Sequence, residues 1–407
     1  MNILFLTDVF YPDTVGGAGR VAYNLSLELC KKGHNVHVIT RNPGNKLPVS
    51  EEFNQGFNVH RFPSPHEQSL GSLISEIKNS YVAARQLIRE IQFDIVCAHQ
   101  CMVAVGPLLS ITLNRVPLIY YFHSPWHEEF QIKIQNSSSL AGIKGKLIST
   151  VMRWLEKRVL LKADRTIVLS RYMANKLSGV HGYSKDRIVK IPGGVDLERF
   201  CLSEKSRKVA IDGFNIPMDR IVYLTVRNLV PRMGLENLVD AFNQSDFLRQ
   251  KGLLLIGGKG SLEGSLKEMI NSFKLENCVR LLGYIPDDLL PGTYNAVDFF
   301  ILPTEKLEGF GLVILEAMSC GTPVIGTPVG AISEVIAPFS KRLLFKGADS
   351  TSLKDKLEEI IQGADRYSFA KSDCRRYIED NFSWGRVADR FEELSLSLIN
   401  TESAMDC

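Results

Sequence analysis

Two glutamates in the C-terminal half of the chain carry the clearest chemical signal of the sequence. Glu308 opens the segment Glu-Gly-Phe-Gly, and Glu316 follows in an apolar stretch that predicts a helix, about two turns from its start. The glycines let the backbone approach a ligand, and the unpaired N–H groups of a helix start attract an anion. Carboxylates on either side of such a site would accept hydrogen bonds from hydroxyl groups. A ligand with a phosphate between two hydroxyl-rich rings is a nucleotide sugar. The spacing fits a strand–loop–helix unit with solvated glutamates equally well.

A resemblance to a known family favours the functional interpretation. Glu308 and Glu316 resemble the E-x7-E motif of the retaining glycosyltransferases of family 4, which have the GT-B fold. The N-terminal strand with the glycine loop at 16–19, the interdomain segment at 191–200 and the closing segment at 382–384 resemble the same family. The resemblance covers nearly the whole chain. It implies a metal-independent, retaining transfer of a sugar from a nucleoside-diphosphate sugar.

The resemblance also implies roles for individual residues. Glu308 would bind hydroxyl groups of the donor sugar, Glu316 the ribose, and the amides of residues 310–312 the sugar or a phosphate. Residues 283–285 resemble the segment whose backbone recognises the base. The catalytic residues implied are His123, Arg227 and Glu308. The donor-binding residues implied are Gly16, Gly17, Arg227, Arg232, Ile285, Glu308, Phe310, Gly311, Leu312 and Glu316.

The phosphate-binding positions contain one departure from the family pattern. Members usually carry an arginine and, five or six residues later, a lysine that together neutralise the leaving diphosphate. Arg227 fits the arginine, but Met233 stands where the lysine is expected. Arg232 beside it is a candidate replacement, because a guanidinium binds phosphate through two parallel hydrogen bonds. The alternative is that Arg232 is solvated and only Arg227 acts.

The glycine loop Gly16-Gly17-Ala-Gly19 follows the first predicted strand and opens a helix. Glycine allows close approach of a ligand to the backbone, and the helix start favours negative charge. The loop lacks the G-x-G-x-x-G spacing of dinucleotide-binding proteins, since Ala22 takes the place of the third glycine. In the family this loop lies over the diphosphate or near the acceptor. The alternative is a tight turn without a ligand.

His123 stands at the end of an apolar strand and precedes Pro125. Such a residue can point into a ligand cleft, and the resemblance places it against the transferred sugar near the reacting carbon; the alternative is a structural histidine. His127 follows at a spacing that would suit two metal ligands on one helix, but Pro125 makes a continuous helix doubtful. No D-x-D motif occurs in the chain. We therefore predict no metal ligand, and no cofactor besides the donor substrate.

Length and composition indicate a two-domain protein of the cytoplasm. The 407 residues exceed what one hydrophobic core normally serves, and no apolar run is long enough for a transmembrane helix. The N-terminus lacks the basic region and cleavage site of a signal peptide. The eight cysteines are scattered without a C-x-x-C pair, which predicts reduced thiols.

Charge is distributed unevenly along the chain. Residues 1–197 contain 23 Lys and Arg against 15 Asp and Glu, whereas the whole chain has a net charge of only +3. No aromatic-laced basic stripe suggests nucleic acid, so the expected partners are a nucleotide sugar and a carbohydrate or lipid-linked acceptor. Residues 144–165 combine basic residues with apolar ones at helical spacing, which suits contact with an anionic membrane at its inner face. The alternative is a core-packed helix with a solvated basic face.

The order of apolar runs predicts an α/β protein of the GT-B type, with two Rossmann-like, doubly wound domains facing across a cleft. We expect an N-terminal, acceptor-side domain of residues 1–197 plus 383–407 and a nucleotide-sugar domain of residues 198–382. Predicted strands are 3–7, 36–39, 59–62, 95–98, 118–122, 166–169, 221–226, 253–256, 279–281, 299–302 and 324–326.

Two other functions remain open at this point. A nucleotide-sugar epimerase shares the fold, although the E-x7-E arrangement is not expected there. A non-catalytic partner subunit would tolerate the loss of a phosphate-binding lysine at Met233. The activity favoured by the resemblance is hexosyl transfer in the biosynthesis of surface polysaccharide or glycoconjugates.

Overall fold

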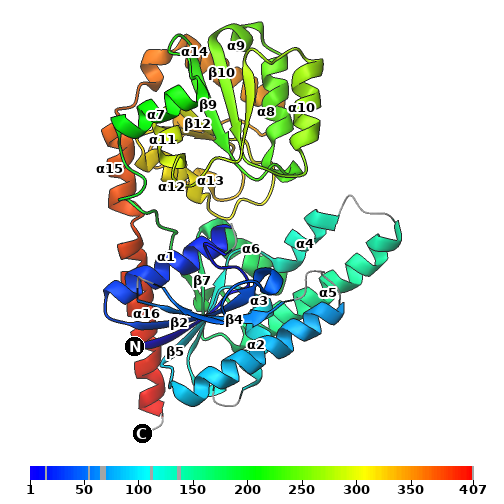
Figure 1. Cartoon of the computed structure of the whole chain (residues 1–407), viewed down its shortest axis with the longest axis vertical. Helices are drawn as coiled ribbons and strands as arrows, with labels where there is room; N and C mark the ends of the chain where they lie inside the picture. Colours follow the sequence, from blue (N-terminus) through cyan, green and yellow to red (C-terminus); the bar gives the residue numbers. More distant parts are fainter. Residues whose placement is uncertain (14–15, 54–55, 65–69, 111–112, 135–138, 406–407) are drawn as a thin grey trace. The chain divides into compact units, whose positions relative to one another are not determined.

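Two separate β-sheets, each flanked by helices, form the centres of the two halves of the chain (Figure 1). The computed structural model describes residues 1–407 except 14–15, 54–55, 65–69, 111–112, 135–138 and 406–407. It divides into one unit of Met1–Gly193 with Trp384–Cys407 and a second unit of Gly194–Ser383. The expected α/β architecture of parallel sheets is thus confirmed.

The first unit has an eight-stranded sheet in the order β3-β4-β2-β1-β5-β6-β7-β8. Its strands are β1 (Asn2–Leu6), β2 (Asn35–Asn42), β3 (Ser50–Glu52), β4 (Asn58–Pro63), β5 (Ile95–Ala98), β6 (Leu118–Phe122), β7 (Arg165–Val168) and β8 (Ile188–Lys190). All neighbours are parallel except β3 and β4. The chain order reverses between β1 and β5, where a doubly wound sheet binds its ligands.

Helices connect these strands in the first unit. They are α1 (Gly17–Lys31), α2 (Leu70–Glu90), α3 (Cys101–Val105), α4 (Trp126–Ile134), α5 (Ser139–Lys162), α6 (Arg171–His181) and the C-terminal α16 (Trp384–Met405). The last helix contacts α1. There Lys32 Nζ and His34 Nε2 lie 2.8 and 2.9 Å from carboxylate oxygens of Glu392. Within the described ranges, no helix combines the length and the hydropathy that crossing a membrane requires.

The second unit has a five-stranded parallel sheet in the order β11-β10-β9-β12-β13. Its strands are β9 (Ile221–Val226), β10 (Gly252–Gly257), β11 (Val279–Gly283), β12 (Phe299–Leu302) and β13 (Val324–Gly326). Strands β9, β10 and β12 are short runs of mostly buried, mostly apolar residues, as expected in a sheet covered on both faces. The chain order reverses between β9 and β12.

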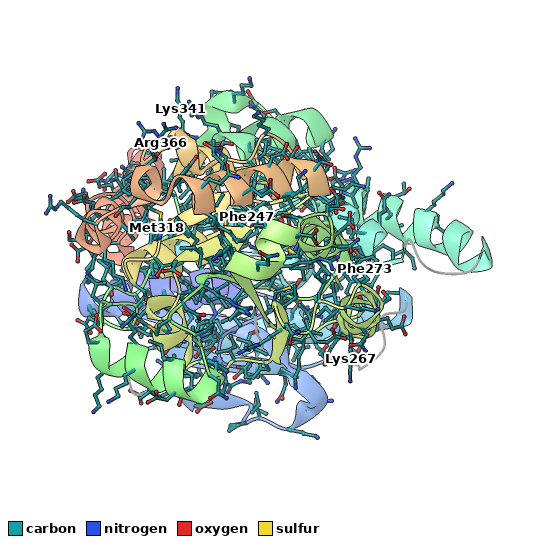
Figure 2. All side chains as sticks on the ribbon, turned by 90° about the horizontal axis from the view of Figure 1, so that it is seen from above. Phe247, Lys267, Phe273, Met318, Lys341 and Arg366 are labelled. Atoms are coloured by element: carbon teal, nitrogen blue, oxygen red, sulfur yellow. The ribbon has the colours of Figure 1, made fainter. Side chains whose placement is uncertain are left out.

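The helices of the second unit surround this sheet. They are α7 (Glu204–Phe214), α8 (Leu235–Asn243), α9 (Asp246–Lys251), α10 (Glu263–Ser272), α11 (Leu290–Asn295), α12 (Leu312–Ser319), α13 (Ile332–Ile336), α14 (Ser350–Gln362) and α15 (Lys371–Asn381). Figure 2 shows Lys267, Lys341 and Arg366 at the outside of this unit, where all three are exposed. Met318 of α12 is fully buried. The apolar helix α12 therefore belongs to the core of the unit, and it begins four residues after Glu308.

Candidate functional site

The switch point of the second sheet brings together the two residues expected to act on the donor. Arg227 follows β9 directly, and Glu308 stands in the loop after β12. Because β9 and β12 are parallel neighbours, their carboxyl ends meet at one edge of the sheet. Ligands of doubly wound sheets bind at such a point. The sequence placed both residues after strands, but the strand order alone brings them together.

Arg227 and Glu308 form a mostly buried ion pair. Nη2 of Arg227 lies 2.5 Å from Oε2 of Glu308, and the side chains are only 8% and 12% exposed. The hydroxyl of Thr304 donates to the same carboxylate oxygen at 3.4 Å. In a low-dielectric surrounding such a pair is held in one geometry, and loss of either partner leaves an uncompensated charge. The site therefore presents a positioned cation and a positioned carboxylate side by side.

Two glycines lie directly against the backbone carbonyls of Glu308 and Arg227, where a larger residue would not fit. Gly330 has φ +62°, and a Cβ atom there would lie 2.2 Å from the carbonyl oxygen of Glu308. Gly258 has φ +131°, and a Cβ atom would lie 1.8 Å from the carbonyl oxygen of Arg227. Any other residue at these positions must displace the backbone that carries Arg227 or Glu308. Their signal in the sequence is a glycine shortly after a predicted strand; the turn that contains Gly258 was expected to be either near a phosphate or purely structural.

Met233, at the position where a phosphate-binding lysine is expected, carries no charge and instead contacts Arg227. The thioether sulfur of Met233 accepts a hydrogen bond from Nη2 of Arg227 at 2.9 Å, and Met233 is buried. Arg232 donates from Nη1 to the carbonyl oxygen of Leu307 at 3.0 Å. The carbonyl oxygen of Arg232 accepts from the amide of Glu305 at 3.0 Å. Arg232 therefore supports the loop that carries Glu308.

The helix after this loop starts later than the sequence suggested. Gly311 caps α12 with φ +85°, Leu312 is its first residue, and Glu316 its fifth. Glu316 thus lies just over one turn into the helix rather than about two. It is buried, and its Oε2 accepts a hydrogen bond from the hydroxyl of Tyr294 at 3.0 Å. Phe310 is buried as well, with its ring edge-on to Phe382 at 6.0 Å between centroids.

Ile285 is buried two residues beyond the end of β11. Its Cδ1 atom lies 2.5 Å from the point where a Cβ of Gly257 would stand. The amide of Gly258 donates to the carbonyl oxygen of Gly283 at 2.7 Å. The expected base-binding segment therefore packs against the turn after β10, next to the backbone of Arg227.

In the first unit, His123 follows β6 and faces a second histidine that the sequence analysis did not single out. Nε2 of His123 lies 3.2 Å from Nδ1 of His99, which follows the neighbouring strand β5. Both rings stack on Tyr121, with centroids 5.1 and 4.9 Å away. Burial lowers the pKa of His123 to about 3, and burial together with the neighbouring His123 ring lowers the pKa of His99 well below its ordinary value. Both imidazoles are therefore neutral at physiological pH.

The glycine loop lies at the start of the first long helix, as predicted. Gly17 is the first residue of α1 and Gly16 precedes it in an extended conformation. Asp8, just beyond β1, was also missed by sequence reasoning. Its carboxylate accepts from the amide of Val103 at 2.9 Å, and burial raises its pKa. Polar side chains therefore gather at the carboxyl ends of β1, β5 and β6.

His127 lies in the first turn of α4, which begins at Trp126, so His123 and His127 do not share a helix. The pair of metal ligands that their spacing suggested does not form in this way. His127 is instead buried near Glu156.

Comparison with known proteins agrees with this architecture. The structure superposes on a sucrose-phosphate synthase from Thermosynechococcus elongatus with a TM-score of 0.82, at 22% identity, covering 98% of this chain and 99% of the other. It superposes on Anabaena HepE in complex with UDP-glucose with a TM-score of 0.73, at 20% identity, covering 98% and 100%. Two Rossmann-like domains of this kind define the GT-B fold.

The sequence comparisons identify the family. Residues 15–199 match the family described as Glycosyltransferase Family 4, and residues 206–379 match Glycosyl transferases group 1. A D-inositol 3-phosphate glycosyltransferase from Geodermatophilus obscurus is 25% identical over 388 residues, which are 92% of this chain and 83% of that protein. The chain belongs to the family 4, group 1 glycosyltransferases with the GT-B fold.

Proposed function

We propose that the protein is a retaining, metal-independent glycosyltransferase that moves a sugar from a nucleoside-diphosphate sugar to a glycan, glycolipid or lipid-linked acceptor. The observation that carries the proposal is the pair of Arg227 and Glu308 at the switch point of the second sheet. A donor of this class has a diphosphate, which needs a cation, next to sugar hydroxyls, which need acceptors. The two side chains supply both groups side by side.

Departure of the nucleoside diphosphate is the step that this arrangement would assist. The guanidinium of Arg227 would stabilise the charge that develops on the leaving phosphate, and Glu308 would orient the sugar through its hydroxyls. The β-phosphate would take the proton of the acceptor on the face from which it leaves, so that the configuration is retained. Phe310, Gly311 and Leu312 would contribute backbone amides, and Glu316 would bind the ribose. Arg232 enters this proposal as support for the loop and as a second cation near the phosphate.

His123 would contact the transferred sugar from the first unit. Its lowered pKa, about 3, leaves the ring neutral, so it can exchange hydrogen bonds with hydroxyls without repelling an oxocarbenium-like centre. Its contact with His99 holds one ring nitrogen at a fixed place. Gly16 and Gly17 would border the diphosphate or the acceptor.

The exposed face of α5 supports an acceptor at an anionic membrane surface. Leu147, Trp154 and Leu161 are 60%, 55% and 56% exposed and follow one another at intervals of seven residues, along one side of the helix. Over residues 145–162, whose side chains the structure describes, the exposed charged residues of this helix are all basic: Lys146, Arg153, Lys157, Arg158 and Lys162. An apolar stripe between cations is the pattern of a helix that lies on an anionic bilayer. We include this face in the proposal as the place where a lipid-linked acceptor would be met.

Donor screening tests the proposed function. UDP-, GDP- and ADP-sugars should be compared for thermal stabilisation of the full chain, since a ligand that binds the folded state raises its apparent stability. One base class should stabilise the wild type but not Arg227→Ala, and sugar should be released from that donor when acceptor extracts are added. Binding without release would favour a non-catalytic partner subunit, and conversion of the donor without acceptor would favour an epimerase. Absence of stabilisation by every donor would contradict the proposal.

A further inference from the structure

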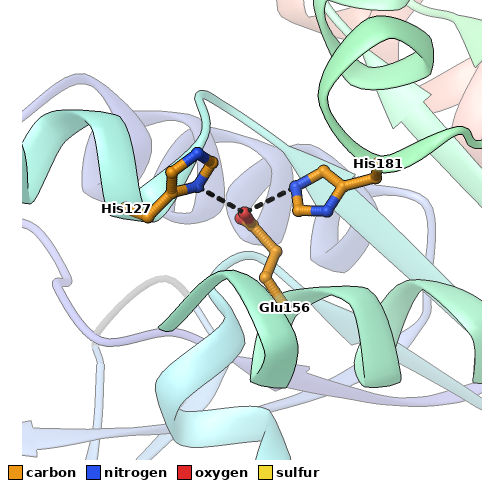
Figure 3. A group of neighbouring side chains, drawn as sticks. All are labelled: His127, Glu156 and His181. Carbon is orange, nitrogen blue, oxygen red and sulfur yellow. Dashed lines mark hydrogen bonds and ion pairs between the residues drawn. The ribbon is translucent and has the colours of Figure 1, made fainter. Parts of the chain in front are cut away.

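Three buried side chains of the first unit form a cluster that the proposed function does not use (Figure 3). His127 stands in the first turn of α4, Glu156 in the second half of α5, and His181 is the last residue of α6. Glu156 is 0% exposed, His181 4% and His127 7%. The cluster therefore joins three successive helices through side chains that are almost fully shielded from bulk solvent.

A hydrogen bond links Glu156 to His181, but His127 lies too far from the carboxylate for one. Oε2 of Glu156 lies 3.0 Å from Nε2 of His181 but 3.9 Å from Nδ1 of His127, which is too far for a hydrogen bond. Nδ1 of His127 is buried, has no hydrogen-bond partner among the residues that the structure describes, and points toward the carboxylate. A buried nitrogen without a partner is costly in free energy. Its position beside a carboxylate and a second imidazole points to a ligand that all three groups share.

We propose that His127, Glu156 and His181 form a structural zinc(II) site. Zinc binds imidazole nitrogen at about 2.0–2.1 Å and carboxylate oxygen at about 2.0–2.2 Å in tetrahedral geometry, which separates ligand atoms by about 3.4 Å. The separations of 3.0 and 3.9 Å lie on either side of this value, and all three ligand atoms lie within 4.8 Å of one another. Small side-chain rotations suffice to equalise them around an ion.

The surroundings of the carboxylate suit a metal ligand. The hydroxyl of Tyr120 donates to Oε1 of Glu156 at 3.2 Å, and the amide of Trp126 lies 3.4 Å from both oxygens. Such outer hydrogen bonds orient a ligating carboxylate. Two imidazoles with one carboxylate are a donor set that zinc accepts, with water as the fourth ligand.

The ion would fix α4, α5 and α6 to one another. Since α4 begins three residues after His123, zinc would also fix the segment that leads out of the candidate active site. This inference goes beyond the proposed function and does not depend on it, because it concerns the folding stability of the first unit and not transfer. It revises the prediction, made from the sequence, that His127 binds no metal.

Metal titration of the full chain tests the site. After chelator treatment and desalting, zinc(II) is added and the metal content and the melting temperature are measured. The visible absorption of cobalt(II), which reports tetrahedral coordination, is recorded in a parallel titration. The variants are His127→Gln and His181→Gln. His60→Gln is the matched control, because His60 pairs with His37 at 3.1 Å in the same unit.

We expect one zinc ion per chain and a rise of about 5 °C in melting temperature at a concentration a hundredfold above Kd. The tetrahedral cobalt spectrum should appear in the wild type and in His60→Gln, and both responses should be lost in His127→Gln and His181→Gln. A wild type that takes up no ion would overturn the proposal and leave a buried ion pair between Glu156 and His181. Equal uptake by the wild type and both cluster variants would also overturn it, because thiols elsewhere would then be the ligands.

Discussion

The guanidinium of Arg227 and the carboxylate of Glu308 are 81 positions apart in the chain and 2.5 Å apart in the structure. Each side chain neutralises the charge of the other. In the proposed function, a nucleotide sugar would share or replace this ion pair. The pair keeps both side chains in place beforehand, so binding requires little ordering of either.

Glu308→Gln is expected to lower turnover on the order of ten- to a thousandfold. The amide oxygen can still accept a hydrogen bond from Arg227, but an NH2 group replaces the second oxygen and cannot accept from a sugar hydroxyl. Initial rates with the donor identified by screening provide the measurement. Glu276→Gln, on an exposed turn of the same unit, is the control and should behave like the wild type. Near-normal rates for Glu308→Gln would rule out its role at the sugar.

Exchange of Met233 for lysine tests how the second phosphate contact is made. Met233→Lys should tighten nucleoside-diphosphate binding if the second cation is missing, whereas Arg232→Ala should weaken binding if Arg232 supplies it. Titration calorimetry with the nucleoside diphosphate separates these effects. Because Arg232 also supports the loop of Glu308 through its hydrogen bond to Leu307, we expect Arg232→Ala to lower turnover in addition to any effect on nucleotide binding. Unchanged nucleotide binding by Arg232→Ala together with a gain in Met233→Lys would show that Arg232 does not contact the phosphate.

Gly330→Ala adds only one methyl group, but we expect it to impair activity strongly. The new methyl group would clash with the carbonyl oxygen of Glu308, and the backbone at φ +62° disfavours a side chain. We expect a loss of melting temperature and at least a tenfold loss of turnover, since small displacements of a positioned group are costly. Gly264→Ala in α10, where a Cβ meets nothing within 4 Å, is the control and should be neutral or stabilising. Equal effects of both substitutions would contradict this reasoning.

The buried histidines predict a loss of stability in mild acid. Burial, together with the neighbouring His60 ring, lowers the pKa of His37 to about 4, whereas an unfolded chain has a histidine pKa of about 6.5. Between these values the unfolded state binds more protons, so stability falls as the pH decreases from about 6.5 toward 4. Melting temperatures at pH 7 and pH 5 should differ less in His37→Gln than in the wild type. Parallel pH profiles of the two proteins would show that His37 does not contribute.

The exposed face of α5 predicts binding to anionic vesicles. Trp154→Ser and the double variant Lys157→Ser with Arg158→Ser should each reduce co-sedimentation, because one removes apolar area and the other attraction to the surface. Higher salt should weaken binding of the wild type, since screening reduces such attraction. Lys267→Ser, exposed on the second unit, is the control. Binding that ignores lipid charge and salt, or no binding, would favour an acceptor in solution.

The sequence by itself determined the architecture and most of its elements. The runs 95–98, 118–122, 221–226, 299–302 and 324–326 are strands with the predicted ends, because buried parallel strands are nearly continuous apolar segments. The strands β3 and β8 were not predicted, since both are short and β3 is fully exposed, without an apolar pattern. The helix that contains Glu316 starts later than expected because Gly311 adopts a left-handed conformation that periodicity does not reveal.

Which side chains meet was decided by the tertiary structure. The order of strands in the sheet brings Arg227 to Glu308, and packing of three helices brings His127 and His181 to Glu156. Local hydrophobic patterns report burial of a segment but not its neighbours. Contacts between residues far apart in the chain depend on how the segments pack. The sequence therefore identified candidate residues, and only the tertiary structure showed which of them are in contact.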